Sequence, residues 1–587
     1  ILKKANTVAV FQLESRGMQG MLKDAQPDRF EDIIALVALY RPGPMDLIPS
    51  FCARKHGREV VEYPDPRVEP VLKETYGIMV YQEQVMQMAQ IIGGYSLGGA
   101  DLLRRAMGKK KPEEMAQHRE IFAQGAAKNG LTREKADETF DLMEKFAGYG
   151  FNKSHAAAYA LLAYHTAWLK AHHPAEFMAA NMSLAMDDTD KVKILFEDCL
   201  TNKMAVLPPD VNASAYRFEP VADSNVAEGK RSRTIRYGLG AIKGSGQNAI
   251  EEILRAREEG GPFKDLFDFC ERIDRRLVNR RTIEAMIRAG AFDTIHANRA
   301  QLLASVPMAM EAADQASANA MQAGLFDMGD APLAAHELVD EPAWGEKRKL
   351  QEEKAALGFY LSGHLFDAYK DEVRRFVRQK IGELKEGRDK LIAGVIASLR
   401  TQMTQRGKML IALLDDGTGQ CEVTVFNEQY EAHKALFKED ELLVVQGGAR
   451  NDAFTGGIRF TVDTVMDLER ARSRYAQAVK VQMNGNADAS ALRTVLEAHR
   501  AKPDDSLPAS VVETRGRGGR DGGGYGGRGR EREQAAIPNG LAVQIVYSNE
   551  HAQGEVRLGD AWRVKPTDEL IAALRGEFAG SSIEIVY

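Results

Sequence analysis

The fold of one part of this chain is decided by Met409-Leu-Ile-Ala-Leu-Leu-Asp-Asp-Gly-Thr-Gly-Gln-Cys-Glu-Val-Thr-Val-Phe426. Two apolar runs flank Asp415–Gly419, and Asp followed by Gly is a strong signal for a tight hairpin turn. The other strand candidates are Leu391–Ile396, Glu441–Val445 and Ile458–Val462. We therefore expect five strands in a small β-barrel.

A helix is expected from Glu428 to Glu439, between the third and fourth strands. Five strands with a helix at that place predict an OB-fold over residues 388–470. Cations and aromatic rings on such a barrel can hold single-stranded DNA, by charge and by stacking on bases. The candidates are Arg400, Arg406, Lys408, Phe426, Arg450, Phe454, Arg459 and Phe460, although some of these aromatics must belong to the barrel core.

Residues 475–587 alternate strand and helix patterns, which predicts a small C-terminal α+β domain. The expected strands are Val479–Met483, Leu541–Tyr547, Glu555–Leu558 and Ile583–Tyr587, and the expected helices are Ala489–His499 and Thr567–Phe578. An Arg-Gly insert at 515–533 cannot form a core, so we expect it to be disordered. It can grip a nucleic-acid backbone or serve as a plain flexible insert, and the sequence leaves both readings open.

Upstream, residues 226–370 carry the pattern of tandem helix-hairpin-helix units, first at Tyr237–Ile250 and then at the helix opened by Asn279. Glycines in such a turn let the backbone approach a phosphate, and the next helix begins with free N–H groups. The alternative is a glycine turn inside an ordinary helical domain. The candidate DNA-backbone contacts are Lys243, Gly244, Gly246, Arg280 and Arg281.

From 311 to 340 the sequence loosens into Ala, Gln, Ser and Asp, which predicts a linker. Inside it, Gln322, Leu325 and Phe326 form a short peptide with an amide and two large apolar side chains. Exposed apolar anchors in a polar segment favour docking into a partner's pocket. The two anchors can instead fold back on their own domain.

Residues 1–225 read as mostly helical, and Asp101–Lys111 is their most charged stretch. Arg104 and Arg105 share a helix whose other face is apolar, and Gly108 is expected to close that helix. Lys109, Lys110 and Lys111 follow directly. Cations on a rigid element suit a triphosphate or a nucleic-acid backbone, while the alternative is a solvated basic face.

A glycine-rich loop, Phe146–His155, leads into a helix expected from Ala156 to His172. Asn152 or Ser154 can cap this helix, whose N-terminus carries partial positive charge. Lys153 adds a full charge there, and Tyr149, Phe151 and His155 offer flat faces to a base or sugar. The loop is therefore a second candidate anion site.

Five long strings closely resemble the fingers region of the bacterial DNA polymerase III alpha subunits, the C-family replicative polymerases: Val8–Gly17, Ala38–Pro44, Tyr76–Gln84, Leu102–Lys111 and Gly148–His155. The resemblance covers the whole chain in the family's order. It implies fingers over residues 1–225, clamp-associated hairpins, an OB-fold and a C-terminal domain that binds the tau subunit of the clamp loader.

The resemblance also implies roles for the residues of these strings. Arg104 and Arg105 would contact the triphosphate of an incoming nucleotide, and Lys109–Lys111 would lie toward the DNA backbone. Tyr149, Asn152, Lys153, Ser154 and His155 would border the nascent base pair, with His155 disfavouring a 2′-hydroxyl. The Gln322–Phe326 peptide resembles the family's internal motif for the sliding clamp beta.

Polymerisation requires two metal ions held by carboxylates, and the family uses Mg²⁺. In the family these palm carboxylates lie upstream of the first string. We therefore expect this chain to bind primer–template DNA, clamp and nucleotide, and not to polymerise alone. The alternative is a non-catalytic, clamp-tethered DNA-binding adaptor.

Composition sets further bounds. The chain has 587 residues, a net charge of −6 and four widely separated cysteines. The length suggests about four domains, and the cysteines fit a reducing cytoplasm better than disulfides or zinc. The sequence contains no apolar run long enough to predict a membrane span. The chain starts at Ile1 without a methionine or signal pattern, which we interpret as a start inside a longer protein.

Overall fold

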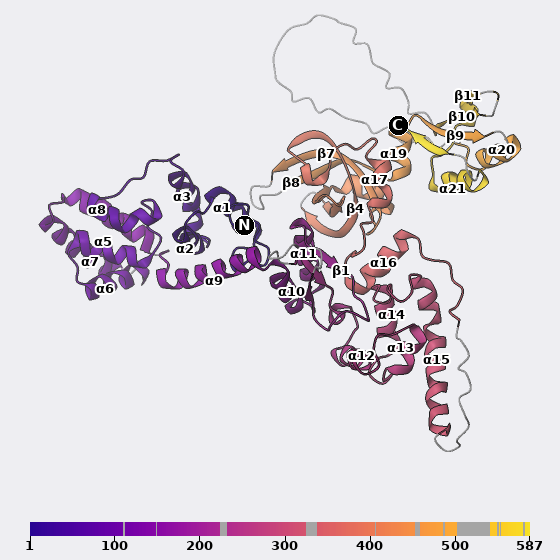
Figure 1. The fold of residues 1–587 in the computed structure, drawn as a ribbon. Helices are drawn as coiled ribbons and strands as arrows, with labels where there is room; N and C mark the ends of the chain where they lie inside the picture. Colours follow the sequence, from indigo (N-terminus) through magenta and orange to yellow (C-terminus); the bar gives the residue numbers. More distant parts are fainter. Residues whose placement is uncertain are drawn as a thin grey trace, which may run out of the picture. The chain divides into compact units, whose positions relative to one another are not determined.

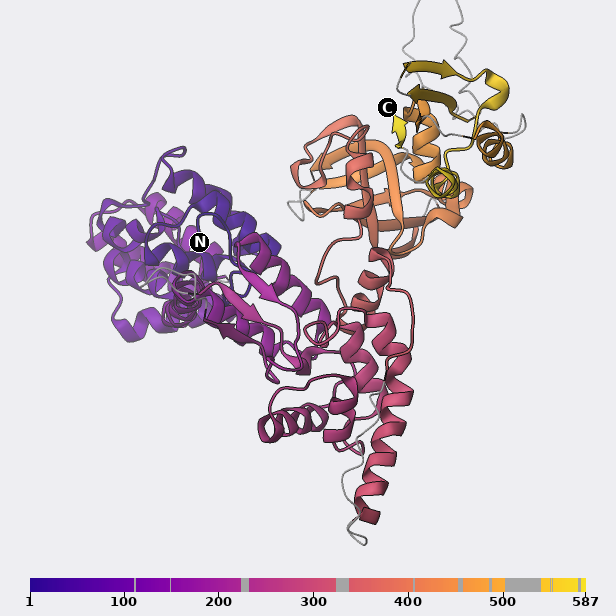
Figure 2. The same cartoon turned by 45° about the vertical axis from the view of Figure 1, so that its right-hand side comes forward.

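The structure is a computed structural model that describes residues 1–109, 112–147, 149–222, 232–323, 337–404, 407–451, 458–484, 488–501, 540–548, 551, 553–578 and 582–587. It divides into two compact units, of which the first is Ile1–Ser362 and the second begins at Gly363. Within the described ranges, no helix is long and apolar enough to cross a membrane. Figure 1 labels the elements, and Figures 1 and 2 colour them along the chain.

The first unit begins with a helical layer built on α9. Its helices are α1 (Arg16–Ala25), α2 (Phe30–Leu39), α3 (Ile48–Lys55) and α9 (Lys153–His172). The buried face of α9 is a stripe of alanines at helical spacing: Ala156, Ala160, Ala163 and Ala167. Small side chains let α2 approach α9 closely, and the two helices lie side by side (Figure 1). The helix begins at Lys153, three residues before the expected start, because Asn152 caps it.

A second helical layer follows with its own core. Its helices are α4 (Glu69–Leu72), α5 (Gln82–Gly93), α6 (Leu97–Lys109), α7 (Pro112–Lys128) and α8 (Arg133–Ala147). Helix α7 crosses α5 so closely that a Cβ at Gly125 would overlap the carbonyl oxygen of Gly93. Helix α6 runs one residue past Gly108, where we expected it to close, because glycine tolerates helical geometry as well as ending it.

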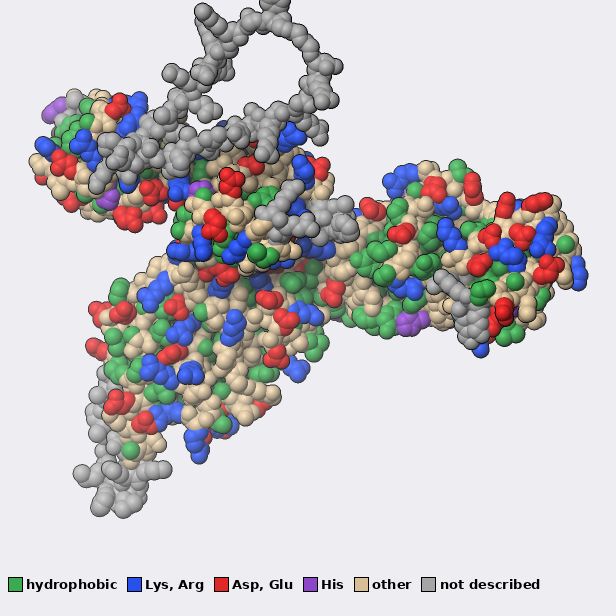
Figure 3. Space-filling view, turned by 180° about the vertical axis from the view of Figure 1, so that it is seen from behind, with side chains coloured by type: hydrophobic (Ala, Val, Ile, Leu, Met, Phe, Trp, Pro, Cys, Tyr) green, Lys and Arg blue, Asp and Glu red, His purple; other side chains and the backbone are tan. Residues whose placement is uncertain are grey.

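The outer face of α9 is unusually apolar. Its half-exposed side chains include Leu161, Leu162, Tyr164, Trp168 and Leu169. Figure 3 shows hydrophobic side chains gathered over these N-terminal helices, among scattered charges. The two lysines of α9 do not interrupt this face, since one stands at the helix start and the other, Lys170, is buried.

The rest of the first unit packs around one large core. Its elements are α10 (Pro174–Leu184), α11 (Thr189–Thr201), β1 (Ala205–Leu207), β2 (Glu219–Val221), β3 (Thr234–Arg236), α12 (Gln247–Gly260), α13 (Leu266–Arg272), α14 (Arg280–Arg288), α15 (Arg299–Ala323) and α16 (Glu346–Leu357). The three strands pair in the order β1-β3-β2. The first predicted hairpin is incomplete, because only a 3₁₀ turn, Leu239–Ala241, precedes its loop.

Helix α15 corrects the predicted linker. We expected loose chain from residue 311, but α15 continues to Ala323 and extends beyond its neighbours in both views (Figures 1 and 2). Alanine, methionine and glutamine are strong helix formers, so this stretch stays helical without a continuous apolar stripe. At its start, buried Arg299 forms ion pairs with Asp293 and with buried Glu353.

The second unit contains a closed five-stranded barrel with the order β4-β5-β6-β8-β7. Its strands are β4 (Gly387–Thr404), β5 (Gly407–Asp415), β6 (Gln420–Val425), β7 (Leu442–Asn451) and β8 (Ile458–Met466). The predicted hairpin is the β5–β6 pair, in which Leu414 faces Cys421. Helix α18 (Asn427–His433) lies between the third and fourth strands and is shorter than expected, because a 3₁₀ turn replaces its last part.

The C-terminal α+β domain is a four-stranded sheet with two helices. Its strand order is β11-β10-β9-β12, with β9 (Ala478–Asn484), β10 (Ala542–Ser548), β11 (Gln553–Arg557) and β12 (Ile583–Val586). Helices α20 (Ala489–Ala498) and α21 (Asp568–Glu577) pack on it, and α17 (Asp367–Val373) and α19 (Leu468–Tyr475) lead into the barrel and out of it. The predicted fold class, helical regions followed by an OB-fold and a small α+β domain, is confirmed.

Candidate nucleic-acid interface

Arg104 and Arg105 share one carboxylate, that of Asp101 one turn earlier on α6. Arg104 donates from Nε and Nη2 to Asp101 Oδ1 at 3.0 and 2.8 Å, and Arg105 Nε lies 2.9 Å from Asp101 Oδ2. Hydrogen bonding from Arg104 holds the pKa of Asp101 below its usual value. The side chain of Arg105 is 63% exposed and that of Arg104 26%. The trio carries a net charge of +1 and still presents both guanidinium groups to solvent.

The loop before α9 is hydrogen-bonded through its backbone to the start of α5. Phe151 N donates to Val80 O at 3.2 Å, and Gln82 N donates to Phe151 O at 2.9 Å. These bonds form a short parallel bridge between Tyr81 and Phe151. The loop is therefore held in place by backbone bonds to residues about 70 positions earlier.

Gln82 joins this loop to α6. Its Nε2 donates to Gly150 O at 3.0 Å, and its Oε1 accepts from Arg104 Nη1 at 3.1 Å. The two segments that the sequence singled out, Arg104–Arg105 and the loop at 149–155, thus meet at one side chain. Sequence reasoning missed Gln82, whose only signal was its place in the Tyr76–Gln84 string.

The N-terminus of α9 already has protein acceptors. Asn152 Oδ1 caps the helix by accepting from His155 N, while Glu83 accepts from Asn152 Nδ2 at 2.8 Å and from Lys153 N at 3.0 Å. Lys153 Nζ lies 2.6 Å from a Glu74 carboxylate oxygen. A phosphate at this helix end would have to displace these carboxylates, and Lys153 is 39% exposed, so Arg105 on α6, at 63%, is the more accessible cation.

Aromatic side chains line the same loop. A Cβ at Gly43, whose φ is +102°, would lie 2.6 Å from the Tyr149 ring, so Tyr149 packs directly on that glycine. Arg41 donates to Tyr149 O at 2.8 Å and lies over the Phe151 ring at 4.2 Å. The His155 ring contacts the Tyr159 ring, with centroids 4.3 Å apart and the planes tilted by 31°. Arg41 therefore supports the loop, and Ser154 lies in the first turn of α9.

The hairpin residues form a second cluster. Gly244 has φ +80°, and neither it nor Gly246 has any atom within 4 Å of an added Cβ, so the turn is open to an approaching backbone. Lys243 beside them is exposed. Thr282 on α14 donates to Gly244 O at 3.4 Å, which brings the two predicted hairpin segments into contact. Arg280 pairs with Glu284, and Arg281 is exposed at the same helix start.

Several predicted residues lie outside the described ranges. Lys110, Lys111, Leu325, Phe326, Arg406, Phe454 and the Arg-Gly insert are among them. Lys109 ends α6 and Gln322 lies in the last turn of α15, and the structure describes the backbone but not the side chain of each. The clamp-peptide prediction and the lysine cluster are thus not tested by the geometry.

The barrel sorts its candidate aromatics into two classes. Phe460 is fully buried in the barrel core, whereas Phe426 is 47% exposed at the end of β6. Arg400 pairs with Glu422 on the outer surface, and Lys408 Nζ lies 5.0 Å from the Tyr430 ring. Phe426 is consequently the described aromatic candidate that could stack on a base.

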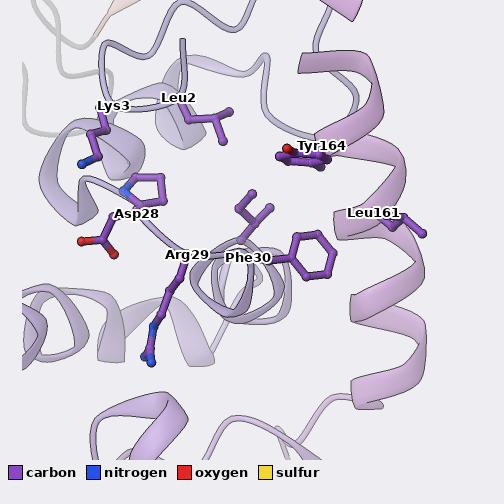
Figure 4. A pocket seen from close by; sticks show the side chains of 9 residues that line it. Leu2, Lys3, Asp28, Arg29, Phe30, Leu161 and Tyr164 are labelled. Carbon is purple, nitrogen blue, oxygen red and sulfur yellow. The ribbon is translucent and has the colours of Figure 1, made fainter. Parts of the chain in front are cut away.

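A pocket of about 640 Å³ lies away from these clusters, where the N-terminus and the start of α2 face α9. Figure 4 shows Phe30 from α2 and Tyr164 from α9 across it, with Lys3 and Arg29 at its edge. The predicted nucleotide-binding residues do not line this pocket. Within the described residues, no group of three His, Cys, Asp or Glu side chains converges as a metal site.

Four family models match the chain in succession. They describe a bacterial DNA polymerase III alpha subunit finger domain at residues 1–130, a helix-hairpin-helix motif at 203–302, an OB-fold nucleic acid binding domain at 391–468 and a DNA polymerase III subunit alpha C-terminal domain at 536–578. The matches follow the order that the sequence predicted.

Curated relatives match over the entire chain. It is 48% identical over 587 residues to a DNA polymerase III subunit alpha of Neisseria meningitidis serogroup A, covering 48% of that protein. It is 43% identical to the Pseudomonas aeruginosa subunit, covering 49% of it, and 41% identical to that of Escherichia coli K12, covering 48%. The chain thus spans about half the length of the curated relatives it matches.

Proposed function

Because this chain belongs to the bacterial DNA polymerase III alpha subunit family, we propose that it supplies the nucleotide-holding and DNA-holding modules of a replicative DNA polymerase. The full-length subunit would synthesise DNA from deoxynucleoside triphosphates on a primer–template. The observation that carries the proposal is the meeting of Arg104 with the loop at 149–155 through Gln82.

In this proposal the arginines of α6 act on the triphosphate. A guanidinium group is always charged and presents a planar fork of N–H donors, which matches phosphate oxygens. Arg104 and Arg105 would hold the β- and γ-phosphates and stabilise the charge that develops on the leaving pyrophosphate. Their bonds to Asp101 orient the forks without neutralising both charges. Tyr149 and His155 would border the base and sugar.

The remaining modules would hold DNA and partners. The open turn at Lys243–Gly246, with Arg280 and Arg281 beside it, suits the phosphate backbone of duplex DNA. The barrel surface near Phe426 suits single-stranded template. The sliding clamp beta would bind Gln322, Leu325 and Phe326, and the C-terminal domain would bind tau, as the family resemblance implies.

The Mg²⁺ ions of the reaction would not be held by the described residues of this chain, which contain no metal-ligand cluster. Their ligands would be carboxylates in the other part of the full-length subunit. No step of the nucleotide-binding proposal passes through a metal ligand of this chain. Alone, the chain should therefore bind DNA without extending a primer.

The test replaces Arg104 and Arg105, singly and together, by alanine in a full-length alpha subunit that carries this segment. Single-nucleotide incorporation should show a KM for the nucleotide about tenfold or more higher per arginine, the loss expected for a charged hydrogen-bonding group. Arg133→Ala is the matched control, because this half-exposed α8 arginine also pairs with carboxylates but lies outside the proposed site.

Unchanged KM values in both arginine variants would refute the triphosphate contact. If DNA and clamp binding persisted in a full-length protein that incorporated no nucleotide under any condition, the adaptor interpretation would replace the polymerase one. Normal KM values for Arg133→Ala are required, since a general loss of charge should not mimic the effect.

A further inference from the structure

Gln82 is the first residue of α5, and its side-chain amide both accepts and donates a hydrogen bond. The oxygen accepts from Arg104 Nη1 at 3.1 Å, and the nitrogen donates to Gly150 O at 3.0 Å. An amide is suited to this place because it carries an acceptor and a donor on one planar group. Arg104 needs an acceptor and the carbonyl of Gly150 needs a donor, and the amide of Gln82 provides both.

The backbone of Gln82 leaves its side chain little freedom. Gln82 N donates to Phe151 O at 2.9 Å, which fixes the start of α5 against the loop. A Cβ at Gly150 would lie 3.1 Å from Gln82 Cγ, so the chain passes close to the amide stem. The amide therefore has a defined direction, and the loop cannot shift without disturbing it.

The hydrogen bonds to Asp101 and Gln82 fix the orientation of the Arg104 guanidinium group. A guanidinium has five N–H groups, and three of those of Arg104 have partners in Asp101 and Gln82. Among the described residues, two N–H groups of Arg104 remain without a partner, one on each terminal nitrogen, and both can donate to phosphate oxygens. Asp101 fixes one side of the group and Gln82 the other.

We propose that Gln82 is a positioning residue, which directs the remaining N–H groups of Arg104 toward the triphosphate and makes their direction depend on the position of the loop at 149–151. This inference rests on the proposed nucleotide-binding function of Arg104. It assigns to Gln82 no contact with the substrate. Its effect should appear in nucleotide affinity, through Arg104, more than in the rate at saturating nucleotide.

Two substitutions separate the two bonds. Gln82→Met keeps the side-chain length and removes both the acceptor and the donor. Gln82→Glu keeps an acceptor for Arg104 but places a carboxylate against the Gly150 carbonyl. Gln87→Met is the matched control, because Gln87 is an exposed glutamine on the same helix.

The kinetic experiment measures single-nucleotide incorporation by a full-length alpha subunit carrying this segment, with one deoxynucleoside triphosphate as the varied substrate. Gln82→Met should raise the KM about tenfold, with kcat within about threefold of wild type. Gln82→Glu should lie between wild type and Gln82→Met. In an Arg104→Ala background, Gln82→Met should add less than about threefold, since the two residues act as one unit.

Hydrogen exchange in the same full-length protein measures the stability of the loop independently of catalytic activity. Gln82→Met should speed exchange of the amides at 149–153, and Gln87→Met should not. Unchanged exchange there, or a Gln82 effect on KM that multiplies fully with that of Arg104→Ala, would overturn the positioning role. If Arg104→Ala itself leaves KM unchanged, the nucleotide-binding function fails, and faster loop exchange would still show that Gln82 holds the loop.

Discussion

The attachment of the C-terminal domain to α17 and α19 is predicted to depend on one buried arginine. Arg472 on α19 is 4% exposed. It donates to both carboxylate oxygens of Glu372 at 2.7 and 2.8 Å, to Pro566 O at 3.0 Å and to Asp568 at 2.7 Å. Tyr587 adds a 2.5 Å hydrogen bond to Glu372. The substitution Arg472→Met keeps the packing volume and removes every one of the arginine's bonds.

The expected cost follows from the burial. Removing one partner of a buried ion pair costs about 3–5 kcal/mol, because the other charge stays unpaired. We expect about 3 kcal/mol, the low end, because Glu372 retains 26% exposure and its bond from Tyr587. At 1.4 kcal/mol per factor of ten, exchange of the amides in β12 and α19 should become roughly a hundredfold faster at pH 7.

The pKa of Glu372 determines how the stability loss of Arg472→Met changes with pH. Burial alone would raise the pKa of Glu372, but hydrogen bonds from Arg472 and Tyr587 keep it below its usual value. In the wild type, the stabilisation contributed by the ionised Glu372 is complete above its unfolded pKa of about 4.3. It is lost as the pH falls through the lower pKa of Glu372 in the folded protein. Without Arg472 the pKa of the buried carboxyl should rise, so protonation on acidification relieves the variant.

The assay compares protection factors, which correct for intrinsic exchange rates, for wild type and Arg472→Met at pH 7 and pH 4. The gap between the two proteins should narrow at the lower pH. Arg493→Met is the control, because that arginine is 69% exposed and its pair with Glu497 should contribute less than about 1 kcal/mol. Protection factors within threefold of wild type at pH 7, or a gap that widens on acidification, would refute the reasoning.

Three other outcomes are expected. Tyr237→Phe should leave the free energy of unfolding unchanged or raise it by up to about 1 kcal/mol, because the buried hydroxyl has no hydrogen-bond partner among the described residues; a loss above 2 kcal/mol in denaturant titration would contradict this. Gly43→Ala should destabilise by about 1–3 kcal/mol, measured the same way, because it needs φ +102° and space that the Tyr149 ring occupies; wild-type stability would show that the ring moves freely. Leu325→Ala with Phe326→Ala should weaken sliding-clamp binding more than tenfold in surface plasmon resonance, as loss of apolar anchors does, and undiminished affinity would exclude this peptide as the anchor.

Local sequence signals determined much of the fold. The hairpin at Met409–Phe426 has the predicted turn and strands, because turn residues and β-branched runs act over a few positions. Asn152 and Asn279 cap α9 and α14 for the same reason. The linker prediction was wrong for residues 311–323, because composition without an apolar stripe does not exclude a helix of good helix formers, and residues 324–336 lie outside the described ranges.

The sequence alone also marked the arginines of α6 and the loop before α9 as candidate anion sites. Asp101 pairs with both arginines at helical spacing, but the partners of Lys153 and Gly150 were decided by the tertiary structure. Lys153 pairs with Glu74, 79 positions away, and Gly150 bonds Gln82, 68 positions away. Such partners depend on how α5, α6 and α9 pack, and side-chain spacing along one helix carries no information about them. The residue types therefore predicted the chemistry, while long-range packing chose the partners.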